Sequence, residues 1–263
     1  MTLLELMLAM SISAIMVGAL SVLASATRQT ADFNQGQSDT TQHARVAMQR
    51  ISRAVADAYA TETYPGVVVV DAIVGTSRFP DTVVVWRPAN GTPANPAGPP
   101  LIKELVIFGP DASDPSQLLE VTAPNDSRTI QLNEASLNTT SGRTLIAGLK
   151  TATSSIRTVI TSRVKTASTS ATSGGTQRAA IRFECELHPS AAEMASFRAG
   201  TTAWNNLSWP QGIYSSSFGL RQIWLRSEIQ LLDREKSADG TYPATVATLP
   251  FFGSATNYYN LNN

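Results

Sequence analysis

Residues 1–64 carry a helical pattern of apolar and polar positions that no proline interrupts, because all 14 prolines lie at Pro65 or later. Between Met1 and Thr27 most residues are apolar, and Glu5 is the only charge. Apolar residues then recur at helical spacing, with charged residues between them: Ala44, Ala47, Ile51, Ala54, Val55 and Ala58. The pattern predicts one nearly continuous helix over residues 1–60, with Gly36 as its weak point and Tyr64-Pro65-Gly66 as its stop.

The two halves of this helix predict different surroundings. Residues 1–27 form a membrane-spanning or core-packing candidate, because a helix of this length extends roughly 40 Å and a hydrocarbon core is about 30 Å thick. Residues 28–60 are amphipathic and need a partner layer to cover their apolar stripe.

Residues 61–263 change to short β-branched runs between turn residues, which predicts a β-rich globular head with large loop insertions. The fold class is therefore α+β, a long N-terminal helix packed on an antiparallel sheet. An irregular loop is expected over Arg87–Pro100 and a short helix over Ala191–Arg198, with Ser190 and Glu193 as a capping box. The predicted strands are Val67–Val74, Thr82–Arg87, Leu101–Phe108, Leu118–Thr122, Thr129–Leu132, Ile156–Val164, Arg178–Leu187 and Leu220–Leu232.

The stretch Thr151–Thr176 is rich in hydroxyl side chains, since Ser and Thr make up more than half of it. Such a composition is typical of a solvated strand pair and loop on the protein surface. An O-glycosylated patch is the alternative interpretation.

Charge and cysteine content exclude several classes of protein. Lys+Arg and Asp+Glu number 20 each, so the basic excess of a nucleic-acid-binding protein is missing from the sequence. A single cysteine, Cys185, excludes an intrachain disulfide and a cysteine-based metal cluster, and its alternating strand predicts a buried thiol. The two histidines, His43 and His188, are interpreted as surface residues.

Motifs for catalysis or metal binding are weak, so no enzyme activity, cofactor or metal is predicted. Ser162 and Lys165 match a Ser-x-x-Lys spacing, but in a predicted strand or loop and without the companion motifs of that chemistry. Asp111, Asp114 and Glu120 form an acidic group in a loop, for which a calcium site is a minor alternative.

The opening residues, MTLLELMLAM, resemble the mature N-terminus of type IV pilins and type II secretion pseudopilins. In that family the first mature residue, here Met1, is N-methylated after a leader is cleaved. The family's glutamate maps onto Glu5. The resemblance covers the start of the chain, roughly as far as Thr30, as sequence, and a long helix followed by a β-rich head as pattern.

A physical argument gives Glu5 a role of its own. A charge at the centre of a bilayer costs about 2.5–3.5 kcal/mol on insertion scales, and less near the interface. The resemblance supplies a partner, the amino group of Met1 in a neighbouring subunit, which would make Glu5 a register device for assembly. The alternatives are an acid tolerated near the interface, a plain membrane anchor, or a signal peptide cleaved near Ala24-Ser25-Ala26, although no basic residue precedes the apolar run.

The sequence departs from the family pattern in three places. No proline occurs near Val22, where many type IV pilins have one, and Gly18 with Ser21 is the candidate for similar loosening of the helix. Cys185 alone cannot close a C-terminal disulfide loop. The predicted head, which takes up the chain after Ala60, is closer in size to larger minor pilins and to the J-type minor pseudopilin.

Two functions are expected from the resemblance. The first is a structural subunit that polymerises into an extracellular filament through its N-terminal helix. The second is a minor, J-like pseudopilin at the tip of a type II secretion pseudopilus. Both imply storage in a bacterial inner membrane before assembly, and copies of the chain, a prepilin peptidase, an assembly platform and an ATPase as partners.

Overall fold

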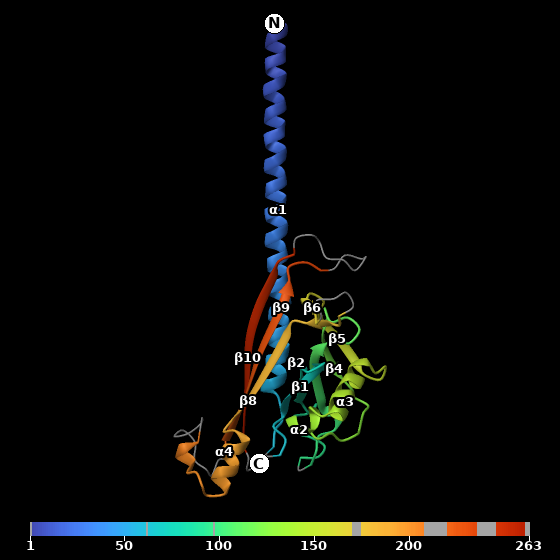
Figure 1. Cartoon of the computed structure of the whole chain (residues 1–263), viewed down its shortest axis with the longest axis vertical. Helices are drawn as coiled ribbons and strands as arrows, with labels where there is room; N and C mark the ends of the chain where they lie inside the picture. Colours follow the sequence, from blue (N-terminus) through green and yellow to red (C-terminus); the bar gives the residue numbers. More distant parts are fainter. Residues whose placement is uncertain are drawn as a thin grey trace.

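A computed structural model of the chain describes residues 2–61, 63–96, 98–169, 175–207, 220–235 and 246–260. Its dominant feature is the helix α1 (Leu3–Ala56), which is unbroken over 54 residues. The N-terminal part of α1 projects away from the rest of the molecule, and its C-terminal part lies against the sheets (Figure 1). The predicted helix is therefore confirmed, with its end at Ala56.

Two antiparallel sheets and one strand pair form the head. The five-stranded sheet has its strands in sequence order: β1 (Val67–Val74), β2 (Ser77–Trp86), β3 (Leu105–Pro110), β4 (Leu118–Thr122) and β5 (Ile156–Thr161). The three-stranded sheet has the order β10-β9-β8, with β8 (Ile181–His188), β9 (Leu220–Leu232) and β10 (Thr248–Asn260). The remaining pair is β6 (Thr166–Ser168) with β7 (Gln177–Ala179).

The centre of the five-stranded sheet, from β2 to β4, is buried on both faces, which explains its continuous apolar runs. One face packs with the three-stranded sheet and with Ala44, Ala47 and Ile51 of α1. The other face packs on α2 (Glu134–Leu137) and α3 (Thr140–Thr151) through Leu137, Ile146 and Leu149. The amphipathic part of α1 therefore has the partner layer that its apolar stripe requires.

Several predicted strand boundaries are wrong. Strand β2 begins at Ser77 rather than at the predicted Thr82, after a tight turn at Gly75, whose φ is +60°. The predicted strand Leu101–Phe108 divides into the 3₁₀ helix η1 (Ile102–Glu104) and β3, because the Glu104 carboxylate accepts hydrogen bonds from Trp86 Nε1 and from the backbone of Ala94 and Leu101. The predicted strand Thr129–Leu132 is reduced to one bridge between Thr129 and Leu101.

The C-terminal half shows further differences. The predicted Ile156–Val164 ends as a strand at Thr161, and the predicted Arg178–Leu187 is interrupted between β7 and β8. The structure adds α2, α3 and β10, none of which was predicted. The remaining small elements are η2 (Trp204–Asn206) and the helix α4 (Ala191–Arg198), which matches its prediction, including the Ser190–Glu193 capping box.

Candidate assembly surface on the projecting helix

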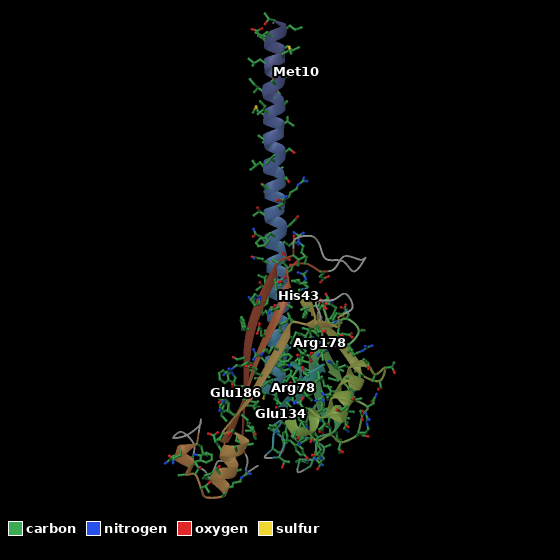
Figure 2. All side chains as sticks on the ribbon, viewed as in Figure 1. Met10, His43, Arg78, Glu134, Arg178 and Glu186 are labelled. Atoms are coloured by element: carbon green, nitrogen blue, oxygen red, sulfur yellow. The ribbon has the colours of Figure 1, made fainter. Side chains whose placement is uncertain are left out.

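The part of α1 that leaves the head, residues 3–35, is exposed at every position and is called here the projecting segment. At 1.5 Å per residue it extends roughly 50 Å. Its large apolar side chains point in all directions around the helix (Figure 2), and 13 of them, between Leu3 and Leu23, have exposed fractions of 50–79%. Water does not stabilise so large an apolar surface, so this segment requires an apolar environment.

By length and composition, α1 qualifies as a membrane span. Its most apolar 18-residue window has a mean hydropathy of 2.3, and none of that window is buried in the head. The hydroxyl groups of Ser11, Thr27 and Thr30 each donate to the backbone carbonyl four residues earlier, at 2.8–2.9 Å. These polar groups are therefore satisfied within the helix, as an apolar environment demands.

The structure gives Glu5 a local partner that was not predicted from the sequence. The Thr2 backbone N–H donates to Glu5 Oε2 at 2.8 Å, and the Glu5 backbone N–H donates to Thr2 Oγ1 at 3.4 Å. The two residues form a capping box at the start of α1. The Thr-x-x-Glu spacing before an apolar run is typical of a capping box, so this contact could have been predicted from the sequence. Met1 lies outside the described residues.

Gly18 lies in regular helix, and α1 shows no break there. A Cβ added at Gly18 would meet nothing within 4 Å. Loosening of the helix at Gly18 thus stays a prediction about the assembled state.

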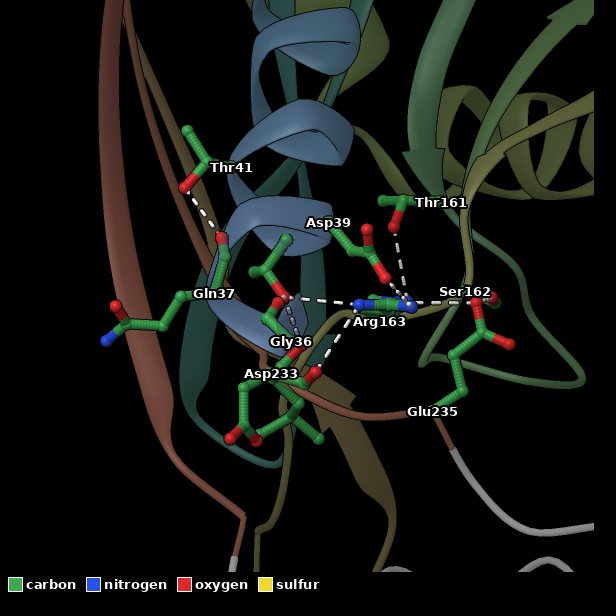
Figure 3. A network of polar contacts seen from close by, with 11 residues as sticks. Gly36, Gln37, Asp39, Thr41, Thr161, Ser162, Arg163, Asp233 and Glu235 are labelled. Atoms are coloured by element: carbon green, nitrogen blue, oxygen red, sulfur yellow. Dashed lines mark hydrogen bonds and ion pairs between the residues drawn. The ribbon is translucent and has the colours of Figure 1, made fainter. Parts of the chain in front are cut away.

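A group of polar contacts holds α1 at the point where the helix leaves the head (Figure 3). We call this group the helix collar. It joins Gly36, Asp39 and Thr40 of α1 to Arg163 after β5 and to the chain after β9, at Asp233 and Glu235. Because the collar lies directly after residue 35, it marks the base of the projecting segment.

Arg163 is the centre of the helix collar. Its Nη1 donates to Thr40 Oγ1 at 3.3 Å and to the Asp233 carbonyl at 3.4 Å, and its Nε donates to Glu235 Oε1 at 3.4 Å. The buried Thr40 hydroxyl lies 2.8 Å from the Gly36 carbonyl and 3.1 Å from the Leu232 carbonyl. One guanidinium therefore links the helix to two separate chain segments.

Packing explains why a glycine occupies position 36, the weak point of the predicted helix. A Cβ on Gly36 would lie 2.9 Å from the Asp233 carbonyl oxygen. Glycine thus lets the backbone after β9 come close to the helix inside the collar.

This contact makes Gly36 and Gly18 a matched pair for substitution. We expect Gly36→Ala to lower the free energy of unfolding of the head by up to about 2 kcal/mol, since overpacking costs about 1–3 kcal/mol and the gain in helix propensity offsets roughly 1 kcal/mol of it. Gly18→Ala should leave that free energy unchanged. Denaturation of the chain in detergent, followed by tryptophan fluorescence, measures both. Equal or greater stability of Gly36→Ala would show that the collar is not closely packed.

The acidic residues considered for calcium do not converge. Glu120 forms an ion pair with Arg50 of α1 at 2.7 Å, whereas Asp111 accepts hydrogen bonds from Ser113 and Asp114 from Ser116. No group of three or more potential metal ligands occurs in the part of the chain that the structure describes. The calcium alternative is therefore not supported.

Ser162 and Lys165 make separate contacts with other parts of the head. The Ser162 hydroxyl donates to Glu235 Oε1 at 3.1 Å, next to the helix collar. Lys165 donates through its backbone N–H to the Gln230 carbonyl, beside β9.

Cys185, predicted to be buried, is half-buried on β8, and its thiol lies 3.8 Å from the Val67 carbonyl. Burial of the sulfur, followed by the nearby Glu134 and Glu186 carboxylates, raises the pKa of this thiol to about 12. Cys185 is thus a poor nucleophile at neutral pH. His43 and His188 are half-buried rather than exposed, and His188 Nε2 lies 3.3 Å from Glu186 Oε2.

The hydroxyl-rich stretch Thr151–Thr176 begins at the end of α3 and contains β5 and β6. Ile156 and Val159 of β5 are more than half exposed, as expected for a solvated strand. Residues 170–174 of this stretch lie outside the described residues.

Comparison of the chain with protein-family models, with curated proteins and with solved structures gave no match. The resemblance to pilins therefore depends on the opening residues and on the architecture itself.

Proposed function

We propose that this chain is a pilin-like structural subunit that polymerises through α1 into a type IV pilus-like filament on the cell surface. One observation carries the proposal: the exposed, apolar projecting segment on a folded head. In a helical filament, the projecting segments of neighbouring copies would bury one another, and the heads would form the outer shell. Before assembly, the inner membrane would hold the same segment.

Glu5 favours packing between copies over simple anchoring. It is the only charge in residues 3–27, and an acid in an apolar environment needs a compensating partner. Among the described residues its carboxylate has the Thr2 hydrogen bond and the N-terminal end of α1, but no basic side chain. The amino group of Met1 in a neighbouring copy would compensate it and would set the axial register. The resemblance further implies a prepilin peptidase, an assembly platform and an ATPase as partners.

A second candidate function is that of a J-like minor pseudopilin at the tip of a secretion pseudopilus. The observation in its favour is the position of α4, at the end of the head farthest from the N-terminus of the chain (Figure 1). A subunit at the tip would present this end to its substrate. This function uses the same α1 packing but needs few copies.

Quantitative mass spectrometry of filaments sheared from cells separates the two candidates. A bulk subunit should outnumber every other pilin-like chain in that fraction, whereas a tip subunit should be present at about one copy per filament. If the chain remains in the inner membrane fraction of cells that make filaments, both candidates are wrong and a plain anchor is supported.

A further inference from the structure

The head contains a cavity of about 380 Å³ that no residue of α1 lines. It lies between strands β1 and β2, helix α3, strand β7 and the loop that follows β3. Its volume is at the lower end of the range of about 300–1,000 Å³ that is typical of small-molecule sites. The size of the cavity thus allows a small ligand.

Three charged side chains from three elements form the inner wall of this cavity: Asp81 of β2, Lys150 of α3 and Arg178 of β7. Asp81 is 3% exposed and Lys150 is 8% exposed. Arg178 Nη2 lies 3.2 Å from Asp81 Oδ2. Lys150 Nζ donates to Thr82 Oγ1 at 3.3 Å, and the Thr82 hydroxyl donates to Asp81 Oδ1 at 2.9 Å. With both basic groups protonated, two cations share one carboxylate.

The hydrogen-bond donors of these cations are not used up. Arg178 Nε and Nη2 are enclosed, yet neither makes a hydrogen bond to any residue that the structure describes, so the approach of Nη2 to Asp81 is an ion pair only. The guanidinium lies 5.2 Å from the centre of the Phe79 ring, which offers no hydrogen-bond acceptor in its plane. An enclosed donor without an acceptor destabilises the folded chain, and a charged donor does so more strongly than a neutral one. Among the described residues, these two guanidinium donors therefore lack a hydrogen-bond acceptor.

The other charges around the cavity have partners of their own. Asp71 lies 3.8 Å from Arg78, and Asp111 accepts hydrogen bonds from the Ser113 backbone and hydroxyl. Arg143, on α3, donates to the Asn138 carbonyl. The lining as a whole is balanced, with three acids and three bases, but the inner wall carries one excess positive charge.

Burial is the main influence on both inner ions. It lowers the pKa of the Lys150 ammonium and raises the pKa of the Asp81 carboxyl, against the opposing effect that each has on the other. Asp111 also raises the pKa of Lys150, and a bound anion beside Lys150 would favour its protonated state further.

We propose that this cavity binds a small carboxylate or phosphate anion, whose oxygens accept hydrogen bonds from the Arg178 guanidinium and the Lys150 ammonium. A guanidinium presents parallel N–H groups that match both kinds of anion. The proposal is independent of filament assembly, because the cavity belongs to the head and contains no residue of α1.

Isothermal titration of the full chain in detergent micelles, with inorganic phosphate or succinate as the probe, tests the proposal. A weak site with two cations is expected to have a dissociation constant of about 1 mM or a few millimolar. Binding of at least one probe to wild type should therefore saturate at probe concentrations below about 50 mM. Lys150→Met and Arg178→Met should each weaken binding about tenfold or more, the value of one charge-assisted hydrogen bond. Lys103→Met, which removes an exposed charge outside the cavity, is the matched control and should bind as wild type.

Asp81→Asn should change the anion affinity in the opposite direction from the two basic variants. It removes the competing carboxylate and keeps the side-chain shape, so anion binding should tighten by about threefold or more. This variant keeps the test informative if either basic variant fails to fold, which near-UV circular dichroism would reveal. Absence of saturable binding to wild type, or identical binding by wild type and Asp81→Asn, would overturn the proposal and leave the three residues as a structural ion cluster.

Discussion

Glu5→Gln should reduce filament yield as severely as Glu5→Ala, while leaving membrane insertion and leader cleavage intact. The reason is that glutamine can still accept the Thr2 N–H hydrogen bond of the capping box but cannot compensate the charge of a neighbouring amino group. The measurement is the amount of filament sheared from cells that carry each variant as the only copy.

Thr2→Ala is the control for this comparison. It removes the hydroxyl that accepts from Glu5 N and leaves the carboxylate in place, so it should cost only the roughly 1 kcal/mol of an N-cap. Filament yield should then stay near that of wild type. If Glu5→Gln assembles normally and Glu5→Ala does not, capping is the role of Glu5 and the register hypothesis is wrong.

Val17→Lys is expected to remove the chain from filaments without changing the head. Val17 is 66% exposed in the middle of the projecting segment, so the substitution disturbs no contact within the folded chain. A lysine there costs about 2.5–3.5 kcal/mol at the centre of a bilayer, and a comparable burial in a filament core would lack a partner. Fractionation of cells into membrane, periplasm and sheared filament measures the result.

Val46→Lys is its matched control on the same helix. Val46 is 47% exposed but lies beyond the helix collar, on the part of α1 that packs on the head. A lysine there faces solvent beside the sheets, so both the melting temperature and the filament yield should stay close to those of wild type. If Val17→Lys is incorporated as well as Val46→Lys, the projecting segment is not the packing surface.

The sequence predicted the structure best where one spacing of apolar residues, helical or alternating, continues over many residues. Helix α1 was predictable over its whole length because apolar spacing, the absence of proline and the Tyr64-Pro65-Gly66 stop agree. Strand β9 was likewise predictable, since alternation continues over Leu220–Leu232. In both cases local preference and tertiary packing favour the same structure.

Prediction failed where tertiary contacts decide the structure. Helix α3 contains two glycines and several threonines, so its local propensity is weak, and burial of Ile146 and Leu149 on the sheet stabilises it. Strand β10 includes Pro250 and Gly253, residues that are rare inside strands, but it is the outer strand of its sheet, where a proline is tolerated.

The candidate site was predictable in part. The apolar run and the position of Glu5 follow from the sequence, and the capping box would have followed from Thr2 and Glu5. The helix collar could not be predicted, because Gly36, Arg163 and Asp233 are brought together only by the packing of α1 on both sheets. The ion cluster at Asp81, Lys150 and Arg178 depends in the same way on three separate elements.

Helical reconstruction by electron cryo-microscopy of filaments purified from cells tests the central claim most directly. The account predicts density for this chain with the projecting segments packed against one another in the core, the heads outside, and Glu5 of one copy beside the amino terminus of a neighbour. Filaments that lack the chain, or that contain it with the projecting segment outside the core, would contradict the account.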